Sequence, residues 1–360
     1  MPPFTRCVVL LALCCLPAMT HAGVRVVPQD SGVEVRLRGI SAVDGNVAWA
    51  SGREGTVLRT LDGGRHWQAI HVPQADELDF RDIEGFDAET AVILAIGPGE
   101  ASRVYRTGDA GKTWQLALQN HDPRAFFDCM AFDGQRGWML GDPVESRFQV
   151  RATEDGGRHW TLLPDGPAAA QGEAAFAASG TCIARIKETL VVATGGARSA
   201  IHFRNDRKSG WKQVASGVEG GSESKGAFSM ARIAQSGDFI VVGGDFHAEK
   251  APAGAVRFVA THARASEHES GGGQTVPKPG GVDAGFDAMP LPATPGYRSG
   301  VACAASGTTC IAVGPSGVDA WDGAGWKPVS DIGYDAIDMV GNTGWASGDG
   351  GRIAHIETGD

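Results

Sequence analysis

The sequence predicts an all-β protein, a seven-bladed β-propeller of four-stranded antiparallel blades. An eight-residue motif, T-x-D-x-G-x-x-W, occurs three times, with its tryptophans 47 and 46 residues apart, and an apolar strand that ends in glycine occurs seven times. Glycine is also abundant, at 52 of 360 residues, as a chain with many tight turns requires. Repeats of about 40–50 residues that each hold four short strands are typical of propeller blades.

The first 22 residues predict a signal peptide. Arg6 precedes an apolar run from Cys7 to Leu16, and a small-residue cleavage site ends at Ala22. The run of about 10 residues is too short to cross a bilayer, which needs about 20. We therefore expect cleavage after Ala22, a periplasmic or secreted product, and a single propeller domain over residues 23–360.

The three motifs predict tight hairpin turns at residues 60–67, 107–114 and 153–160. In such a turn an Asp carboxylate accepts backbone N–H bonds, a Gly takes the left-handed conformation, and the Trp begins the next strand. This pattern is the Asp-box, or BNR-like, repeat. We interpret its residues as structural rather than catalytic: Asp62, Trp67, Asp109, Trp114, Asp155 and Trp160.

The strands that end in glycine give the number of blades. They end at Gly52, Gly97, Gly141, Gly195, Gly243, Gly314 and Gly348. The seventh repeat lacks its last strand, because the chain stops shortly after Ile356. Residues Val24–Gln29 resemble Ile70–Gln74, the segment that follows the first motif. We therefore expect the mature N-terminal strand to complete the seventh blade and close the ring, which removes exposed sheet edges.

Two further segments interrupt the regular repeats. Residues 262–285 are rich in Gly, Ser and Pro and predict a flexible insertion where the fifth motif would lie. Cys303 and Cys310 flank a short turn, so a disulfide between them is possible in an oxidising compartment. Cys129 and Cys182 take equivalent places in consecutive blades, and the spacing of blades favours two unpaired core residues there.

The composition restricts the partners. The net charge of −10 becomes −11 when the signal peptide removes Arg6, which argues against nucleic acid as a partner. The mature chain holds no apolar segment long enough for a transmembrane span. We find no dinucleotide-binding glycine pattern and no metal-ligand spacing, and so expect no cofactor and no metal. We expect a monomer.

One face of the propeller is the candidate for function. The loops that join successive blades share a face with the loops that follow the second strand of each blade. Charged and aromatic residues gather in these loops, as is typical of a binding site. The candidate partner-binding residues are Arg53, Arg81, Asp82, Glu100, Arg103, Asp128, Asp142, Arg147, Arg198, Asp245, Arg298 and Asp335.

The repeats also resemble a known family. Together with Trp49–Gly52, Gly344–Gly348 and Ile96–Arg103, they are similar to the photosystem II stability/assembly factor-like family of Asp-box propellers, over essentially all of the mature chain. Nothing in the sequence indicates photosynthesis, so the resemblance is to a non-photosynthetic bacterial member. It implies an assembly or stability factor that binds a periplasmic or membrane-associated protein through an arginine-bearing face, with no catalytic residues. The family's arginine patch does not transfer residue by residue.

An enzymatic alternative remains. Sialidases also carry Asp-boxes on a propeller, and paired carboxylates such as Asp128 and Asp142 could serve a carbohydrate-active hydrolase or lyase. Sialidase chemistry needs an arginine triad and a Tyr nucleophile, whereas this chain has only three Tyr, lacks an Arg-Ile-Pro signature and counts seven blades rather than six. Relatives are often labelled oxidoreductases, for which the sequence gives no basis. We favour a binding scaffold over an enzyme.

Overall fold

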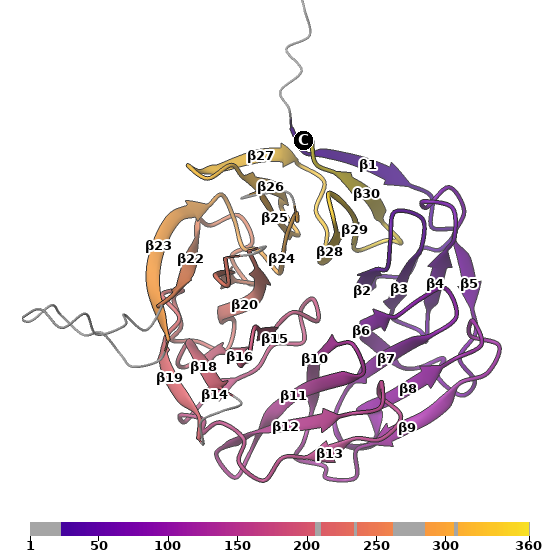
Figure 1. Cartoon of the computed structure of the whole chain (residues 1–360), viewed down its shortest axis with the longest axis horizontal. Coiled ribbons are helices and arrows are strands. Elements are labelled where there is room, and N and C mark those ends of the chain that lie inside the picture. The colour runs from indigo at the N-terminus through magenta and orange to yellow at the C-terminus, as the bar shows by residue number, and fades with distance from the viewer. Residues whose placement is uncertain (1–22, 206–209, 234–235, 262–284, 306–308, 360) are drawn as a thin grey trace, which may run out of the picture.

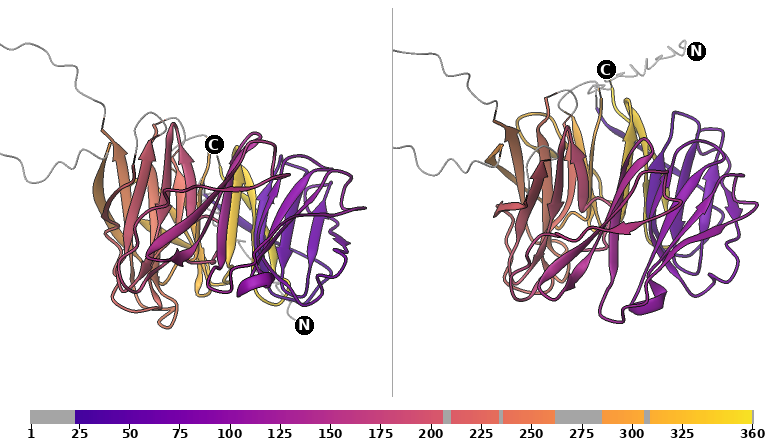
Figure 2. Two further views of the ribbon diagram at one scale, coloured as in Figure 1. Left: turned by 90° about the horizontal axis from the view of Figure 1, so that it is seen from below. Right: turned by 60° about the horizontal axis from the view of Figure 1, so that its bottom comes forward.

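The computed structural model describes residues 23–205, 210–233, 236–261, 285–305 and 309–359. Seven antiparallel sheets surround a central axis as the blades of a propeller (Figure 1), which confirms the predicted fold. Seen from the side, the strands stand across the thickness of the ring (Figure 2). The predicted signal peptide and residues 262–284 of the predicted insertion lie outside the described residues.

Each blade contains four antiparallel strands, with the first strand named for each blade nearest the axis (Figure 1). The first three blades are β2 (Leu37–Ala42), β3 (Ala48–Gly52), β4 (Val57–Thr60) and β5 (Gln68–Ile70); β6 (Asp79–Gly85), β7 (Ala91–Ile96), β8 (Arg103–Thr107) and β9 (Gln115–Gln119); and β10 (Phe127–Asp133), β11 (Arg136–Val144), β12 (Arg147–Thr153) and β13 (Thr161–Leu162). The fourth is β15 (Ile183–Ile186), β16 (Thr189–Ala193), β18 (Ala200–Asn205) and β19 (Lys212–Ala215).

The remaining blades follow the same order. They are β20 (Lys225–Arg232), β21 (Phe239–Asp245), β22 (Ala253–Ala260) and β23 (Phe286–Thr294); β24 (Gly300–Cys303), β25 (Cys310–Gly314), β26 (Gly317–Trp321) and β27 (Trp326–Ser330); and β28 (Ala336–Val340), β29 (Thr343–Ser347), β30 (Ile353–Glu357) and β1 (Arg25–Gln29). Two short strands, β14 (Glu173–Ala174) and β17 (Gly195–Gly196), extend the inner edge of the fifth blade. The one helical element in the described ranges is a 3-10 turn, η1 (Gly99–Ala101). The described residues therefore contain no helix with the length and apolar character of a membrane span.

The N-terminal strand closes the ring as predicted. β1 pairs antiparallel with β30, from Arg25 opposite Glu357 to Gln29 opposite Ile353. The Gln29 side chain then joins the last blade to the first, because its Oε1 accepts hydrogen bonds of 3.2 Å from the indole N–H groups of both Trp67 and Trp345. The seventh blade is therefore made from both ends of the described chain.

The three repeated turns at 60–67, 107–114 and 153–160 use their carboxylates internally. Oδ1 of Asp109 accepts the backbone N–H of Thr113 at 2.9 Å, and Oδ2 accepts its hydroxyl at 2.6 Å. Asp62 and Asp155 accept the N–H of the residue four places on at 2.9 and 3.0 Å. These acceptors stabilise the turns, as expected for structural residues.

Core packing between blades depends on close contacts between a large and a small residue. Trp49 of β3 is fully buried, and its indole N–H donates to the carbonyl of Asp87 in the next blade at 2.8 Å. Gly85 lies directly against this ring, where a Cβ would come within 2.4 Å of Trp49 Cδ1. Any larger residue at 85 would push the first two blades apart.

Both cysteine pairs form disulfides. Cys303 and Cys310 are opposite each other on β24 and β25 and are bonded. Cys129 and Cys182 are also bonded, with their Cα atoms 6.0 Å apart, so the expectation of two unpaired residues was wrong. The reason is the position of these residues near the axis, where the first strands of successive blades converge to within disulfide range.

Candidate functional site

A β-bulge at the start of the first strand aims one side chain at the centre of the ring in four blades. The pairing register skips one residue between Leu37 and Gly39, Phe80 and Asp82, Phe127 and Cys129, and Ala227 and Ser229. The extra residues are Arg38, Arg81, Asp128 and Phe228, and all four line one cavity. Bulges commonly re-aim a side chain in this way.

The sixth and seventh blades supply residues at the same position. Ser299 and Asp335 directly precede the first paired residues of β24 and β28, and both line the cavity. Six of the seven blades therefore contribute one side chain each from equivalent positions. The cavity is a product of the repeat and lies near the axis.

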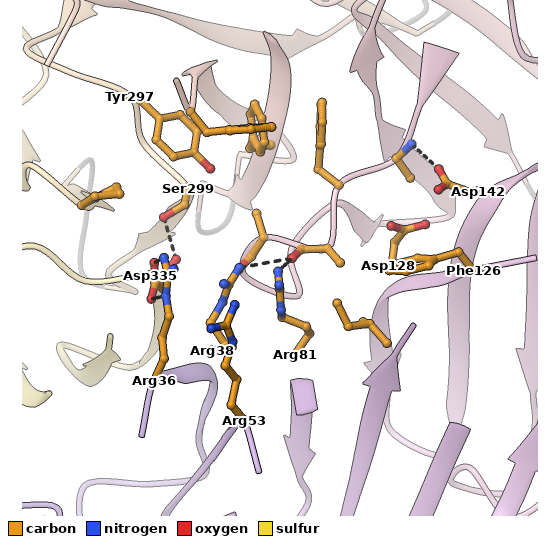
Figure 3. Close-up of a pocket in the computed structure, with 18 of the residues that line it drawn as sticks. Arg36, Arg38, Arg53, Arg81, Phe126, Asp128, Asp142, Tyr297, Ser299 and Asp335 are labelled. Atoms are coloured by element: carbon orange, nitrogen blue, oxygen red, sulfur yellow. Dashed lines mark hydrogen bonds and ion pairs between the residues drawn. The ribbon is translucent and has the colours of Figure 1, made fainter. Parts of the chain in front are cut away.

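The cavity has a volume of about 480 Å³ (Figure 3). Besides these six residues, its lining includes Asp142 of β11 and, from neighbouring loops, Arg36, Arg53, Phe126, Phe246, Glu249 and Tyr297. Residues 175–178, between β14 and β15, border it as well. Phe176 of this segment stacks on Phe228 with ring centroids 3.9 Å apart.

Four arginines form one side of the cavity, the arginine wall: Arg36, Arg38, Arg53 and Arg81. Arg36 makes a bidentate ion pair with Asp335, at 2.8 and 2.7 Å, which raises the pKa of the guanidinium. Arg53 and Arg81 share the Oδ2 of Asp79, at 3.6 and 3.1 Å. Two carboxylates thus pair with three of the four guanidinium groups, and none pairs with Arg38, so the arginine wall and these two partners together carry two surplus positive charges.

Arg38 is the arginine with the weakest partners. Only 8% of it is exposed, and its Nη2 donates two long bonds of 3.5 Å to the carbonyls of Ala177 and Ala178. Among the described residues its Nε has no hydrogen-bond partner. Burial, followed by the neighbouring charge of Arg81, lowers the pKa of Arg38 to about 10. The group remains a cation at neutral pH and lacks a carboxylate to balance it.

Two carboxylates form the opposite side of the cavity, the acidic corner: Asp128 and Asp142 (Figure 3). Asp128 is only 2% exposed, and its Oδ2 has no hydrogen-bond partner in the described chain. Oδ1 of Asp142 accepts the backbone N–H of Ala175 at 3.0 Å. Burial raises the pKa of both groups, and for Asp128 the charge of Asp142 raises it further.

Aromatic rings form the third side. Phe228 lies at the centre, with Tyr297 packed edge-on at 4.8 Å and Phe246 at 6.1 Å between ring centroids. Phe246 follows β21 and is 38% exposed, so an apolar ring stands at the margin of the cavity. Across the described residues, no group of three or more His, Cys, Asp or Glu could hold a metal ion.

The structure brings five of the twelve predicted residues together at the cavity: Arg53, Arg81, Asp128, Asp142 and Asp335. The other seven do not line it: Asp82, Glu100, Arg103, Arg147, Arg198, Asp245 and Arg298. Glu100, Arg147 and Arg198 are exposed. Arg103 donates to the carbonyl of Glu100, and Asp245 accepts the backbone N–H of His247.

Arg298 differs most from its expected role. It is 2% exposed, and its guanidinium donates to Asp319 at 2.6 Å and to Ser316 and the Tyr297 carbonyl at 2.9 Å. It precedes Ser299, the residue that faces the cavity, by one position. Because successive side chains in an extended strand point to opposite faces, Arg298 points into the protein interior.

Asp82 is displaced for the same reason, since it follows the cavity residue Arg81. Its Oδ2 accepts the backbone N–H of Met130 in the next blade at 2.7 Å. Asp338 does the same for Ala42 at 2.8 Å. Burial raises the pKa of Asp82 to about 7 and that of Asp338 to about 6. These carboxylates join neighbouring blades.

The sequence prediction missed several lining residues: Arg36, Arg38, Phe176, Phe228, Phe246 and Glu249. Arg38 and Phe228 share the bulge position of Arg81 and Asp128, but the distance from this position to the glycine that follows varies from 13 to 16 residues, so the sequence alone does not mark it. Phe176 had no sequence signal, since it lies in a segment of small residues between two blades.

The fold and the cavity together define a seven-bladed β-propeller with a charged cavity near its axis. Neither protein-family models nor curated protein sequences match the chain. Solved structures do: YCF48 bound to D1 peptide, at a TM-score of 0.61 and 11% identity, covers 95% of this chain and 99% of its own. YCF48 from Cyanidioschyzon merolae has a TM-score of 0.61 and 17% identity, covering 93% and 99%.

A third solved structure with a similar fold belongs to a protein with a different name. The WD40 β-propeller domain of Doa1 has a TM-score of 0.56 and 10% identity, covering 93% of this chain and 97% of its own. Similarities at these identities show the fold alone. They agree with the seven-bladed architecture and do not by themselves assign a site.

Proposed function

We propose that the protein is a secreted, non-catalytic binding scaffold, an assembly or stability factor that engages a periplasmic or membrane-associated protein through the cavity. The observation that carries the proposal is Arg38, a buried guanidinium at the cavity with no carboxylate partner among the described residues. A carboxylate of a partner protein would supply the missing acceptors in a charge-assisted pair. The two surplus positive charges of the arginine wall favour an acidic segment.

The similar structures support a polypeptide as the ligand. One of them is YCF48 bound to D1 peptide, a propeller of the same overall fold with a peptide ligand. The charge distribution of this chain supports the same choice, because its net charge is −10 while the arginine wall is positive. Attraction for an acidic segment would therefore be confined to the cavity.

Export is part of the proposal. The two disulfides support an oxidising compartment, where such bonds persist. Expression of the full chain in a bacterial host should give a periplasmic protein whose mass corresponds to a start at Gly23. Recovery of the uncleaved chain from the cytoplasm would contradict this part of the proposal.

The binding function is tested with immobilised protein and a library of N-acetylated hexapeptides, each position fixed in turn as Glu or Gln. We expect Glu to be retained at least about tenfold over Gln at one or more positions. Arg38→Met should abolish this preference, whereas Arg198→Met, which removes an exposed arginine away from the cavity, should keep it. A wild-type ratio near one would overturn the proposal.

One observation favours an enzyme as the second candidate. Asp128 and Asp142 are two carboxylates of raised pKa at one side of a cavity, the kind of pair that acid–base hydrolysis uses. Turnover of labelled glycans by wild type, lost in Asp128→Asn, would support a carbohydrate-active hydrolase. Absence of turnover together with peptide retention would favour the scaffold.

A further inference from the structure

The acidic corner is a second, oppositely charged part of the cavity. The bulge in β10 aims Asp128 at the cavity from the position that Arg38 and Arg81 occupy in the first two blades. The same backbone device therefore presents cations from two blades and an anion from the third. Figure 3 shows Asp128 and Asp142 close together and apart from Arg36, Arg38 and Arg53.

The arginine wall does not satisfy the acidic corner. Arg81 is the nearest cation to it, and its guanidinium donates to Asp79 and to the carbonyl of Ala177. Asp128 keeps an oxygen without a hydrogen-bond partner among the described residues, although the residue is 98% buried. A buried carboxylate oxygen in this condition costs free energy, because that oxygen has lost water and gained no donor in its place.

A basic side chain would supply what is missing. An ammonium or guanidinium group donates several hydrogen bonds and can serve two adjacent carboxylates at once. Phe126 also lines the cavity beside Asp128, and a cation is attracted to an aromatic face. The acidic corner thus suits a cationic side chain in two ways: its charge is opposite, and its carboxylate oxygens can accept the several N–H donors of that side chain.

We propose that the acidic corner binds the ammonium or guanidinium group of a lysine or arginine in the same protein segment whose carboxylate contacts the arginine wall. This inference rests on the proposed function and makes it more specific. The ligand is then a segment that carries both signs of charge, and a purely acidic segment binds more weakly. The separation of the two groups in the cavity fixes which end of the segment lies over which blades.

The test extends the hexapeptide library with positions fixed as Lys or as norleucine, which has a similar length and no charge. Wild-type protein should retain Lys about tenfold over norleucine at one position, in addition to its preference for Glu over Gln at another. Asp128→Asn should bring the Lys-to-norleucine ratio close to one and leave the Glu-to-Gln ratio unchanged. Asp245→Asn, which alters a carboxylate that does not line the cavity, should change neither ratio.

Folding does not confuse this test, because Asp128→Asn keeps the side-chain shape and removes a carboxyl group whose charged form is disfavoured by burial. Its melting temperature should equal or exceed that of wild type. A wild-type protein that selects Glu but not Lys would overturn the inference and leave the proposed function standing. Selection of Lys that survives Asp128→Asn and Asp142→Asn would place the cation elsewhere and also overturn it. Selection of neither residue would overturn both proposals.

Discussion

Arg38 and Arg298 are both almost completely buried, with 8% and 2% of their surfaces exposed; Arg38 is the second residue of β2, and Arg298 lies two residues before β24. Their surroundings differ. Arg298 meets a carboxylate, a hydroxyl and a carbonyl at 2.6–2.9 Å, whereas Arg38 meets two carbonyls at 3.5 Å. A buried arginine with full partners stabilises the fold, whereas the proposed function assigns the one without them to a ligand. The same contrast separates Asp82, which binds a backbone N–H of the next blade, from Asp128.

The largest expected effect is on stability. Arg298→Met should lower the free energy of unfolding by about 3–5 kcal/mol, because it leaves Asp319 buried without its counter-charge. Arg38→Met should change it by less than about 1 kcal/mol or increase it, since no carboxylate loses a partner. Urea denaturation of both variants measures the difference. Equal losses of unfolding free energy would show that Arg38 stabilises the fold as much as Arg298 does and would contradict the contrast drawn between them.

A change of pH should distinguish Asp82 from an ordinary surface carboxylate. Burial raises its pKa to about 7, above the value of about 4 in an unfolded chain, so the folded state binds the proton more tightly. Its contribution to stability is present below pH 4 and is lost as the pH rises through 7. Asp82→Asn should remove this loss.

Urea denaturation between pH 4 and 8 tests this directly. Over this range the variant should gain roughly 2–4 kcal/mol relative to wild type. Asp338 and Asp128 also have raised pKa values and remain in both proteins, so the difference between the two proteins isolates Asp82. A difference that does not vary with pH would show that Asp82 is charged throughout.

A smaller effect is expected on binding. Arg81→Met removes one charge of the arginine wall while Asp79 keeps its contact with Arg53 at 3.6 Å. The affinity for the Glu-containing hexapeptides should fall about threefold to tenfold, less than for Arg38→Met, because Arg81 already has a carboxylate partner. Fluorescence titration with a labelled library member measures both variants. A greater loss for Arg81→Met would shift the anion site toward the second blade.

The smallest effect on stability is expected in the repeated turns, where the polar groups have hydrogen-bond partners but remain close to water. Asp109→Ala removes the acceptor of the Thr113 N–H and hydroxyl in a repeated turn. The loss of stability should be small compared with that of Arg298→Met, because water can replace part of what the carboxylate supplied. Thermal unfolding checks it. A loss of stability as large as that of Arg298→Met would mean that the number of hydrogen bonds removed, and not the burial of the group, determines the size of the effect.

The repeat made the fold predictable, whereas the inward-facing residues were harder to identify. Arg81, Asp128 and Asp335 were chosen from loop position, and they do line the cavity. Arg298 and Asp82 were chosen by the same rule, and each is one residue away from the position that faces it. A shift of one residue reverses the face of a strand, and bulges that no sequence pattern marks decide where that shift occurs.

The sequence by itself determined what local chemistry and periodicity control: seven second strands with a glycine at or near the end, the repeated turns, and the strand that closes the ring. The tertiary structure decided what depends on atoms brought together from distant repeats. It placed Cys129 within reach of Cys182, laid residues 175–178 beside the arginine wall, and left Arg38 Nε and Asp128 Oδ2 buried without hydrogen-bond partners in the described chain. Turn geometry is fixed within a few residues, whereas the burial and pairing of a charge depend on neighbours that only the closed ring supplies.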